Sequence, residues 1–244
     1  MSLALNLTRI RERIADACRH ANRPETEVAL MAVTKMHPAE TVMEAFDAGL
    51  RLFGENRVQE WQEKFPAMSE LFAASPENSN SAQVHLIGPL QSNKTTRAAE
   101  LFHAIDSVDS LKIATRLNTA AGALNKKLPI MIEVKLSHEE SKHGISPAEL
   151  PALLAALAPL ESIIPVGLMT VPPWSEDPEP ARPYFRELRR LRNASLAGCP
   201  TLTQLSMGMS NDFAVAIEEG STCIRIGTAL FGKRQYPAAE ATNQ

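Results

Sequence analysis

A lysine at the end of a short apolar run is the first candidate for chemistry in this sequence. The run extends from Ala29 to Val33, Lys35 is the first charged residue after it, and Pro38 interrupts the backbone shortly afterwards. When burial removes water from a lysine, its pKa falls and its amine becomes nucleophilic towards a carbonyl group. Lys35 is therefore a candidate for forming a Schiff base with a carbonyl compound.

Two glycine-containing segments near the C-terminal end have the composition of an anion site. The segment LSMGMSND places Gly208 between serines, and RIGTALFG places Gly227 and Thr228 at the start of an expected helix. Small residues let backbone N–H groups approach a ligand, hydroxyls add hydrogen bonds, and helix N-termini favour anions. We predict a phosphate site here. The alternative is ordinary helix capping by the polar residues Ser210, Asn211 and Asp212.

The elements that must position these residues alternate regularly along the chain. Eight short β-rich runs are each followed by a segment with helical spacing of apolar residues. The expected strands are 29–34, 52–55, 84–88, 104–108, 130–136, 163–170, 202–206 and 222–227. This alternation implies parallel strands with helices outside and predicts an α/β fold, a (β/α)8 TIM barrel. An open doubly wound sheet is the competing architecture.

We expect one domain over residues 1–244, with an extra N-terminal helix within 1–26 and a C-terminal tail at 233–244. In a barrel of this kind, functional residues lie where the strands end and the loops to the helices begin. Lys35 follows the first expected strand, and the two glycine-containing segments follow the seventh and eighth. Phosphate sites in this fold are often built from those last two loops, so the candidates share one face.

An arginine in the last expected strand narrows the choice of ligand. A Schiff-base lysine beside a phosphate site indicates either pyridoxal phosphate or a sugar phosphate in an aldolase. Arg225 lies two residues before Gly227, where strand alternation directs it to the barrel mouth. There it could donate a hydrogen bond to a pyridine nitrogen and keep that nitrogen unprotonated. The alternative is a buried ion pair of Arg225 with Glu55 or Asp106.

The composition argues against several other classes of function. The net charge is −3 and the sequence pI is about 6.1, which favours neither nucleic acid nor an anionic membrane. The arginine-rich segment ARPYFRELRRLR is expected to bury Phe185, Leu188 and Leu191 and to expose its charges. The three cysteines and the histidines lack metal-ligand spacing, so we predict no metal site. Without a signal peptide or a membrane-spanning apolar run, the protein is expected to be cytoplasmic.

Motifs along nearly the whole chain carry a resemblance to one family. They are AVTK, FGENRVQE, HLIGPLQSNK, IDSVDS, ESKHG, GLMTVPP, LSMGMSNDFAVAIEEGST and IRIGTALFG, and they extend from about Ala32 to Gly232. Together they resemble the YggS/PROSC-type pyridoxal phosphate homeostasis proteins. That family is similar to the N-terminal barrel domain of alanine racemases, which implies the same barrel fold.

The resemblance implies a Schiff base between Lys35 and pyridoxal phosphate (PLP), with Asn56 beside the cofactor ring and Arg225 facing the pyridine nitrogen. It implies phosphate-side contacts by Ser206, Met207, Ser210, Gly227 and Thr228. The family is associated with binding PLP, buffering its free level and influencing vitamin B6 balance. Apo-enzymes that use PLP are then possible protein partners.

Whether the chain also catalyses a reaction depends on a second acid–base group. A two-base racemase needs one group on each face of the substrate, and in alanine racemases a tyrosine from a second domain supplies it. Tyr184 and Tyr236 lie on an expected outer helix and in the tail. We therefore expect a monomeric PLP carrier, with a cryptic PLP-dependent amino-acid racemase or lyase as the alternative. The roles of His85, Lys94 and Lys142 remain open.

Overall fold

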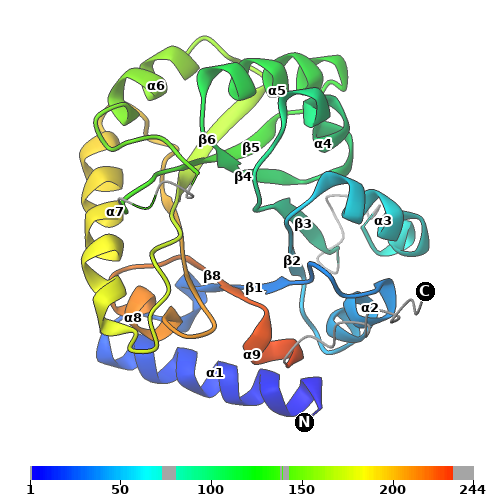
Figure 1. Cartoon of the computed structure of the whole chain (residues 1–244), viewed down its shortest axis with the longest axis vertical. Helices are drawn as coiled ribbons and strands as arrows, with labels where there is room; N and C mark the ends of the chain where they lie inside the picture. The colour runs from blue at the N-terminus through cyan, green and yellow to red at the C-terminus, as the bar shows by residue number, and fades with distance from the viewer. Residues whose placement is uncertain (1, 73–80, 138, 140–142, 233–244) are drawn as a thin grey trace, which may run out of the picture.

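The computed structural model describes residues 2–72, 81–137, 139 and 143–232. Its eight parallel strands close into a barrel in chain order, and β8 pairs with β1 (Figure 1). The strands are β1 Ala29–Val33, β2 Leu52–Glu55, β3 Gln83–Leu86, β4 Ala104–Val108, β5 Leu128–Glu133, β6 Ile163–Met169, β7 Gln204–Met209 and β8 Cys223–Ile226. The predicted TIM barrel is confirmed, and the open sheet is wrong.

The helices form an outer ring around this barrel (Figure 1). They are α1 Leu3–His20, α2 Ala39–Asp47, α3 Val58–Phe72, α4 Thr95–Leu101, α5 Leu111–Ala123, α6 Leu150–Leu157, α7 Arg182–Ser195, α8 Phe213–Glu218 and α9 Thr228–Phe231. Short 3-10 turns occupy Glu25–Glu27 (η1), Ser92–Lys94 (η2) and Glu179–Ala181 (η3). None of the helices in the described ranges is long and apolar enough to cross a membrane.

The extra N-terminal helix α1 supports the last two helices of the barrel. Ser2 caps it by accepting a hydrogen bond from the Leu5 amide, and an apolar stripe that includes Leu7 and Ile10 is buried. The helix packs along α8 and α9. The Asn6 amide nitrogen also donates to the Leu230 carbonyl oxygen at 2.9 Å. In this way α1 supports α9, which follows directly after Gly227.

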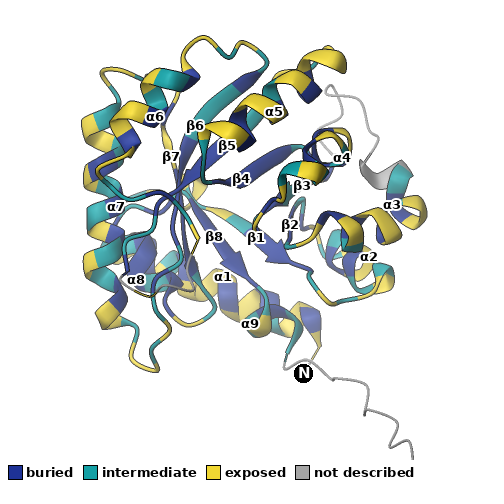
Figure 2. Ribbon diagram, turned by 45° about the horizontal axis from the view of Figure 1, so that its top comes forward, coloured by how far each residue is buried: buried dark blue, intermediate teal, exposed yellow. Residues whose placement is uncertain are grey.

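The core has two layers, and most residues of the strands are buried (Figure 2). Strand residues such as Ala32 and Ile224 belong to the apolar layer between the sheet and the helices. Alternation directs their neighbours to the barrel interior. Several of these interior residues carry sulfur or a polar group: Met31, Met131, Met169, Cys223, His85, Asp106 and Arg225. The interior is therefore polarisable and partly polar.

The seventh strand extends further than its sequence predicts. The sequence predicts an end at residue 206, but β7 continues to Met209. Gly208 has φ +96°, and a Cβ atom there would lie 2.6 Å from Ala216. The register with β8 shifts between Ser206 and Met209, which marks a β-bulge. Because of the bulge, the chain stays in the sheet past Gly208, although a glycine at this point of the sequence is typical of a loop.

The burial of the thiols leads to a labelling prediction. Cys18 and Cys223 are buried, whereas Cys199 is partly exposed. Burial, with the Asp106 charge nearby, raises the pKa of Cys223 to about 12. Its thiolate fraction at about pH 8 is then about one in ten thousand. We expect a thiol-specific disulfide reagent to modify only Cys199 quickly in the native protein and all three cysteines in denaturant. Fast native modification of Cys223, located by peptide mass spectrometry, would contradict this.

Candidate functional site

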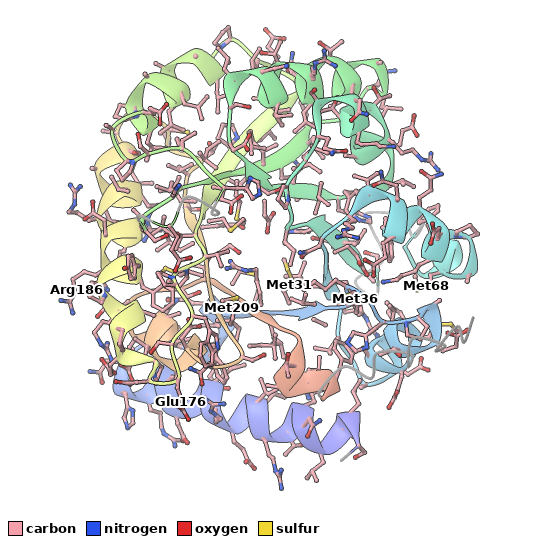
Figure 3. All side chains as sticks on the ribbon, in the orientation of Figure 1. Met31, Met36, Met68, Glu176, Arg186 and Met209 are labelled. Atoms are coloured by element: carbon pink, nitrogen blue, oxygen red, sulfur yellow. The ribbon has the colours of Figure 1, made fainter. Side chains whose placement is uncertain are left out.

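A cavity of about 700 Å³ opens where the barrel strands end. Residues that follow β1, β2, β3, β6, β7 and β8 contribute to its wall, so it lies on the predicted face of the barrel. Six of the eight sequence-predicted site residues line it: Lys35, Asn56, Ser210, Arg225, Gly227 and Thr228. Figure 3 shows Met209, another lining residue, near the centre of the ring of strands.

Lys35 lies in a tight turn at the end of β1. The Thr34 amide still donates to the Gly54 carbonyl oxygen at 3.0 Å, so sheet pairing continues up to the residue before the lysine. The His37 amide then donates back to the Thr34 carbonyl oxygen at 3.1 Å and closes the turn. Lys35 is half-buried and lines the cavity. The turn therefore delivers a primary amine to the cavity from the end of the strand.

Asn56 is placed by a close backbone contact with the next βα loop. It follows β2 directly, and Gly88 two residues after β3 packs onto its backbone. A Cβ atom at Gly88 would lie only 2.3 Å from the Asn56 carbonyl oxygen. The Ile87 amide donates to the Glu55 carbonyl oxygen at 2.9 Å and keeps the two segments in register. The Asn56 backbone can therefore take this position only because residue 88 has no Cβ atom.

Arg225 reaches the cavity from β8 and is held by β7 and by the residue that follows β6. Its guanidinium donates to the Ser206 hydroxyl on β7 at 2.7 Å and to the Thr170 carbonyl oxygen after β6 at 2.8 Å. Only 4% of its surface is exposed. These two contacts use two of the five N–H groups that a guanidinium carries. The remaining N–H groups can donate to a ligand.

The alternative ion pair of Arg225 is not formed. Glu55 points to the helix layer, where the Lys64 ammonium lies 2.8 Å from its carboxylate. Asp106 contacts the His85 ring at 3.1 Å. Both carboxylates therefore have other cationic or ring partners. His85 is therefore a barrel-lining residue whose ring is held by Asp106 of the neighbouring strand β4.

Two predicted phosphate contacts lie beneath the cavity wall. Ser206 and Met207 both fall within β7, and neither is among the described residues that line the cavity. The Ser206 hydroxyl supports Arg225. Met207 is fully buried in the layer between sheet and helices. Strand alternation gives these neighbours opposite directions, so any contact of Met207 with a ligand would have to come from its backbone.

The loops after β7 and β8 are tied to each other. The Ala229 amide donates to the Ser210 hydroxyl at 3.2 Å, and the Asp212 carboxylate accepts from the Met209 amide at 2.6 Å. The Asn211 side chain donates to the Ser175 carbonyl oxygen at 2.8 Å in the loop after β6. None of these three polar side chains caps α8 by a side-chain hydrogen bond. Ser210 and Asn211 instead join the loops after β6, β7 and β8, and Asp212 holds the end of β7.

Several lining residues were missed by the sequence analysis: Glu133, His143, Val171, Trp174 and Glu176. Glu133 ends β5, and its position at a strand end was the available signal. The others lie in loops whose folding over the mouth no local pattern encodes. Asp212, for which the sequence indicates only a capping role, also lines the cavity. Burial raises its pKa, and the hydrogen bond from the Met209 amide and the Arg225 charge oppose this rise.

Two other polar residues in the described part of the chain, Lys94 and Tyr184, do not line the cavity. Lys94 is half-buried in η2 and does not line it, whereas Lys142 and Tyr236 fall outside the described residues. Tyr184 is on the outer helix α7. That helix buries Phe185, Leu188 and Leu191 as predicted. Three of its arginines pair with Glu219, and Arg186 projects from its outer face (Figure 3).

Comparison with known proteins places the chain in a family. Residues 5–235 match the family model described as alanine racemase, N-terminal domain. The pyridoxal phosphate homeostasis protein of Aquifex aeolicus is 40% identical over 237 residues, covering 97% of this chain and 100% of that protein. The protein of the same name from Escherichia coli is 41% identical over 240 residues, covering 96% and 97%.

Solved structures agree with this assignment. PipY of Synechococcus elongatus with PLP bound superposes with a TM-score of 0.81 at 38% identity, covering 95% of this chain and 100% of that one. An alanine racemase of Clostridium difficile shares the fold, with a TM-score of 0.67 at 16% identity, covering 97% of this chain and 57% of that one. The chain therefore belongs to the alanine racemase N-terminal domain family and, within it, to the pyridoxal phosphate homeostasis proteins.

Proposed function

We propose that this protein binds PLP in the cavity, holds it reversibly through Lys35, and acts in PLP homeostasis by buffering or delivering the cofactor. One observation carries the proposal: a primary amine, a buried guanidinium and two joined hydroxyl-bearing loops line the same cavity. The names of the relatives and the PLP bound in PipY support the choice of ligand.

The residues present fit this cofactor chemically. When bound, PLP supplies an aldehyde carbon that forms a C=N bond with a primary amine, and the aldehyde oxygen leaves as water. Lys35 provides the amine, and its half-buried turn limits water around it. Arg225 provides N–H donors for a ring nitrogen. Ser210, Gly227 and Thr228 provide hydroxyls and small residues suited to a phosphate.

Arg225 is suited to hold a ligand and unsuited to transfer a proton to it. Burial lowers the pKa of Arg225, while Cys223 and the carboxylates of Asp106, Glu133 and Asp212 act in the opposite direction. An arginine remains protonated even so, because its ordinary pKa lies far above neutral pH. The guanidinium therefore donates a hydrogen bond and keeps its proton. A nitrogen facing it stays unprotonated, which favours holding the cofactor over turning over a substrate.

The cavity wall also bears on the racemase alternative. Among the described residues, the lining contains no tyrosine that could act opposite Lys35. We expect α-proton exchange of amino acids, followed by NMR in deuterated buffer with the PLP-loaded protein, to stay near the rate for free PLP. Exchange that is fast and depends on the protein would instead support a PLP-dependent racemase or lyase.

The test of the proposed function is chemical trapping. The protein is incubated with PLP, reduced with borohydride and digested, and the modified lysine is located by mass spectrometry. We expect the phosphopyridoxyl group on Lys35, because this amine lines the cavity. Incubation with a sugar phosphate in place of PLP tests the aldolase alternative, which predicts that the sugar becomes attached to Lys35. Absence of a Lys35 adduct at PLP concentrations that label free surface lysines would overturn the proposal.

Delivery needs a separate measurement. The PLP-loaded protein is mixed with an apo-enzyme that requires PLP, and the recovery of that enzyme's activity is compared with recovery from the same total concentration of free PLP. A carrier that hands over its cofactor restores activity in the presence of a scavenger of free PLP. Restoration that the scavenger abolishes would mean that the protein only buffers free PLP.

A further inference from the structure

Three charged side chains form a buried cluster behind the Lys35 turn: Glu55, Glu60 and Lys64, here called the Lys64 cluster. The Lys64 ammonium lies 2.8 Å from Glu55 and 2.7 Å from Glu60. It is 9% exposed, and Glu55 is fully buried. Lys64 and Glu60 come from α3, on the outer side of the barrel. None of the three lines the cavity.

The cluster binds the chain immediately before Lys35. The Lys64 ammonium donates to the Thr34 carbonyl oxygen at 2.9 Å, and the Thr34 hydroxyl donates to the Glu55 carboxylate at 2.7 Å. The same carbonyl oxygen accepts from the His37 amide at 3.1 Å, which closes the turn. The Lys64 ammonium therefore binds both the Thr34 carbonyl oxygen, which closes the turn, and the Glu55 carboxylate, which accepts from the Thr34 hydroxyl.

The cluster also binds the chain immediately after Lys35. The Met36 amide donates to the Glu60 oxygen that accepts from Lys64. Met36 has φ +61°, a left-handed conformation that is strained for any residue except glycine or asparagine. Its side chain is 58% exposed, so apolar burial does not stabilise this conformation. The hydrogen bond from the Met36 amide to Glu60 is a contact that opposes the strain.

The cluster depends on Lys64 for its charge balance. Burial raises the pKa of Glu55, and the Lys64 charge and hydrogen bond oppose this rise. One Glu55 oxygen, Oε2, has no hydrogen-bond partner in the described part of the chain. Removing Lys64 would leave a buried carboxylate without its cation, and the Thr34 carbonyl oxygen and Glu60 would lose their shared donor.

We propose that Lys64, with Glu55 and Glu60, is a positioning residue for Lys35: it holds Thr34 and Met36, on either side of the lysine, so that the Lys35 amine is presented to the cavity. This inference rests on the proposed function of Lys35 in binding PLP. A buried ion cluster could instead serve stability alone. The two roles differ in what they do to the turn and to the affinity for PLP.

The test compares two lysines that both donate to backbone carbonyl oxygens. Lys64→Met removes the cluster's cation. Lys126→Met is the matched control. Lys126 lies two residues before β5, at the opposite end of the barrel, and its ammonium donates to the Phe102 carbonyl oxygen at 3.0 Å. Amide hydrogen exchange of Met36 and His37 is measured without cofactor. The Kd for PLP is measured by absorption, and unfolding by denaturant gives the stability of each variant.

We expect Lys64→Met to weaken PLP affinity by about tenfold or more, by analogy with the loss when a group that orients a metal-binding side chain is removed. Protection of the Met36 and His37 amides should fall by a similar factor relative to barrel amides. Lys126→Met should change stability without changing the Kd. Unchanged exchange and unchanged Kd in a folded Lys64→Met variant would overturn the positioning role.

Two further variants keep the test decisive. Glu60→Ala removes the acceptor of the Met36 amide at a site that is 21% exposed, and it serves if Lys64→Met does not fold. Met36→Gly in the Lys64→Met background should recover part of the lost affinity, because glycine adopts positive φ without strain. A Glu60→Ala variant with unaltered affinity and exchange would also overturn the proposal. If the wild type fails to bind PLP, the proposed function is wrong. The hydrogen exchange of the Met36 and His37 amides still shows, independently, whether the Lys64 cluster stabilises the turn.

Discussion

Replacing Lys35 with alanine is expected to abolish the covalent retention of PLP. Lys35 is the only primary amine among the described residues that line the cavity. Without it the C=N bond has no partner, and the absorption band of the bound cofactor should disappear. We expect the Kd for PLP to rise by about a hundredfold or more, equivalent to about 2.8 kcal/mol. Absorption spectroscopy after gel filtration measures both the band and the retained cofactor.

The control for this variant is a lysine on the same end of the barrel. Lys94 lies in η2, after β3, and does not line the cavity. Lys94→Ala should keep the band and the affinity of the wild type. Both variants should unfold within about 1 kcal/mol of the wild type, since neither side chain belongs to the apolar core. A full absorption band in the Lys35→Ala variant would show that another amine holds the cofactor.

Replacing Gly88 with alanine is expected to damage both stability and the site. The added Cβ would lie 2.3 Å from the Asn56 carbonyl oxygen and 2.8 Å from its Cα, so backbone must move. Overpacking of this kind costs about 1–3 kcal/mol. For a chain of this size each kcal/mol lowers Tm by about 2–4 °C. Because Asn56 and Gly88 both line the cavity, the affinity for PLP should fall as well.

Gly198→Ala is the matched control for Gly88→Ala. A Cβ atom at Gly198 would meet only the Ser195 carbonyl oxygen, at 3.8 Å, which is an ordinary contact. We expect its stability to stay within about 0.5 kcal/mol of the wild type. Calorimetry and PLP titration of the two variants give the comparison. Equal melting temperatures and equal affinities would mean that the Asn56 backbone can move away from position 88 at no cost.

The fold was predictable because its signal is local and repeated. Parallel strands in a barrel are covered by helices outside and side chains inside, so a segment such as 29–33 (ALMAV) is a continuous apolar run. The unit then recurs eight times, and small errors at each boundary do not change the count. The predicted ends of β5 and β7 each differ by three residues from the observed ends, and the difference at β7 arose from Gly208. Its positive φ belongs to a bulge that continues the strand, whereas glycine more often ends one.

The candidate site was only partly predictable. Lys35, Arg225 and the loops at Ser210 and Gly227 could be assigned to one face, because strand ends in a barrel share that face. The contact of Gly88 with Asn56 could not, since it joins two different βα units. The shared hydrogen bonds of Lys64 were also hidden. They depend on how α3 packs against the end of β1, which no periodicity in either segment encodes.

The amino-acid sequence by itself determined the barrel, the functional face, the resemblance to PLP homeostasis proteins and the lysine to which the ligand chemistry points. These follow from alternation along each strand and from motifs within single loops. Only the tertiary structure decided which groups meet: Arg225 with Ser206 and Thr170, Ser210 with Ala229, and Lys64 with the Lys35 turn. The physical reason is that these contacts join separate units of the barrel, and their geometry is set by strand register and burial, neither of which is a property of one segment.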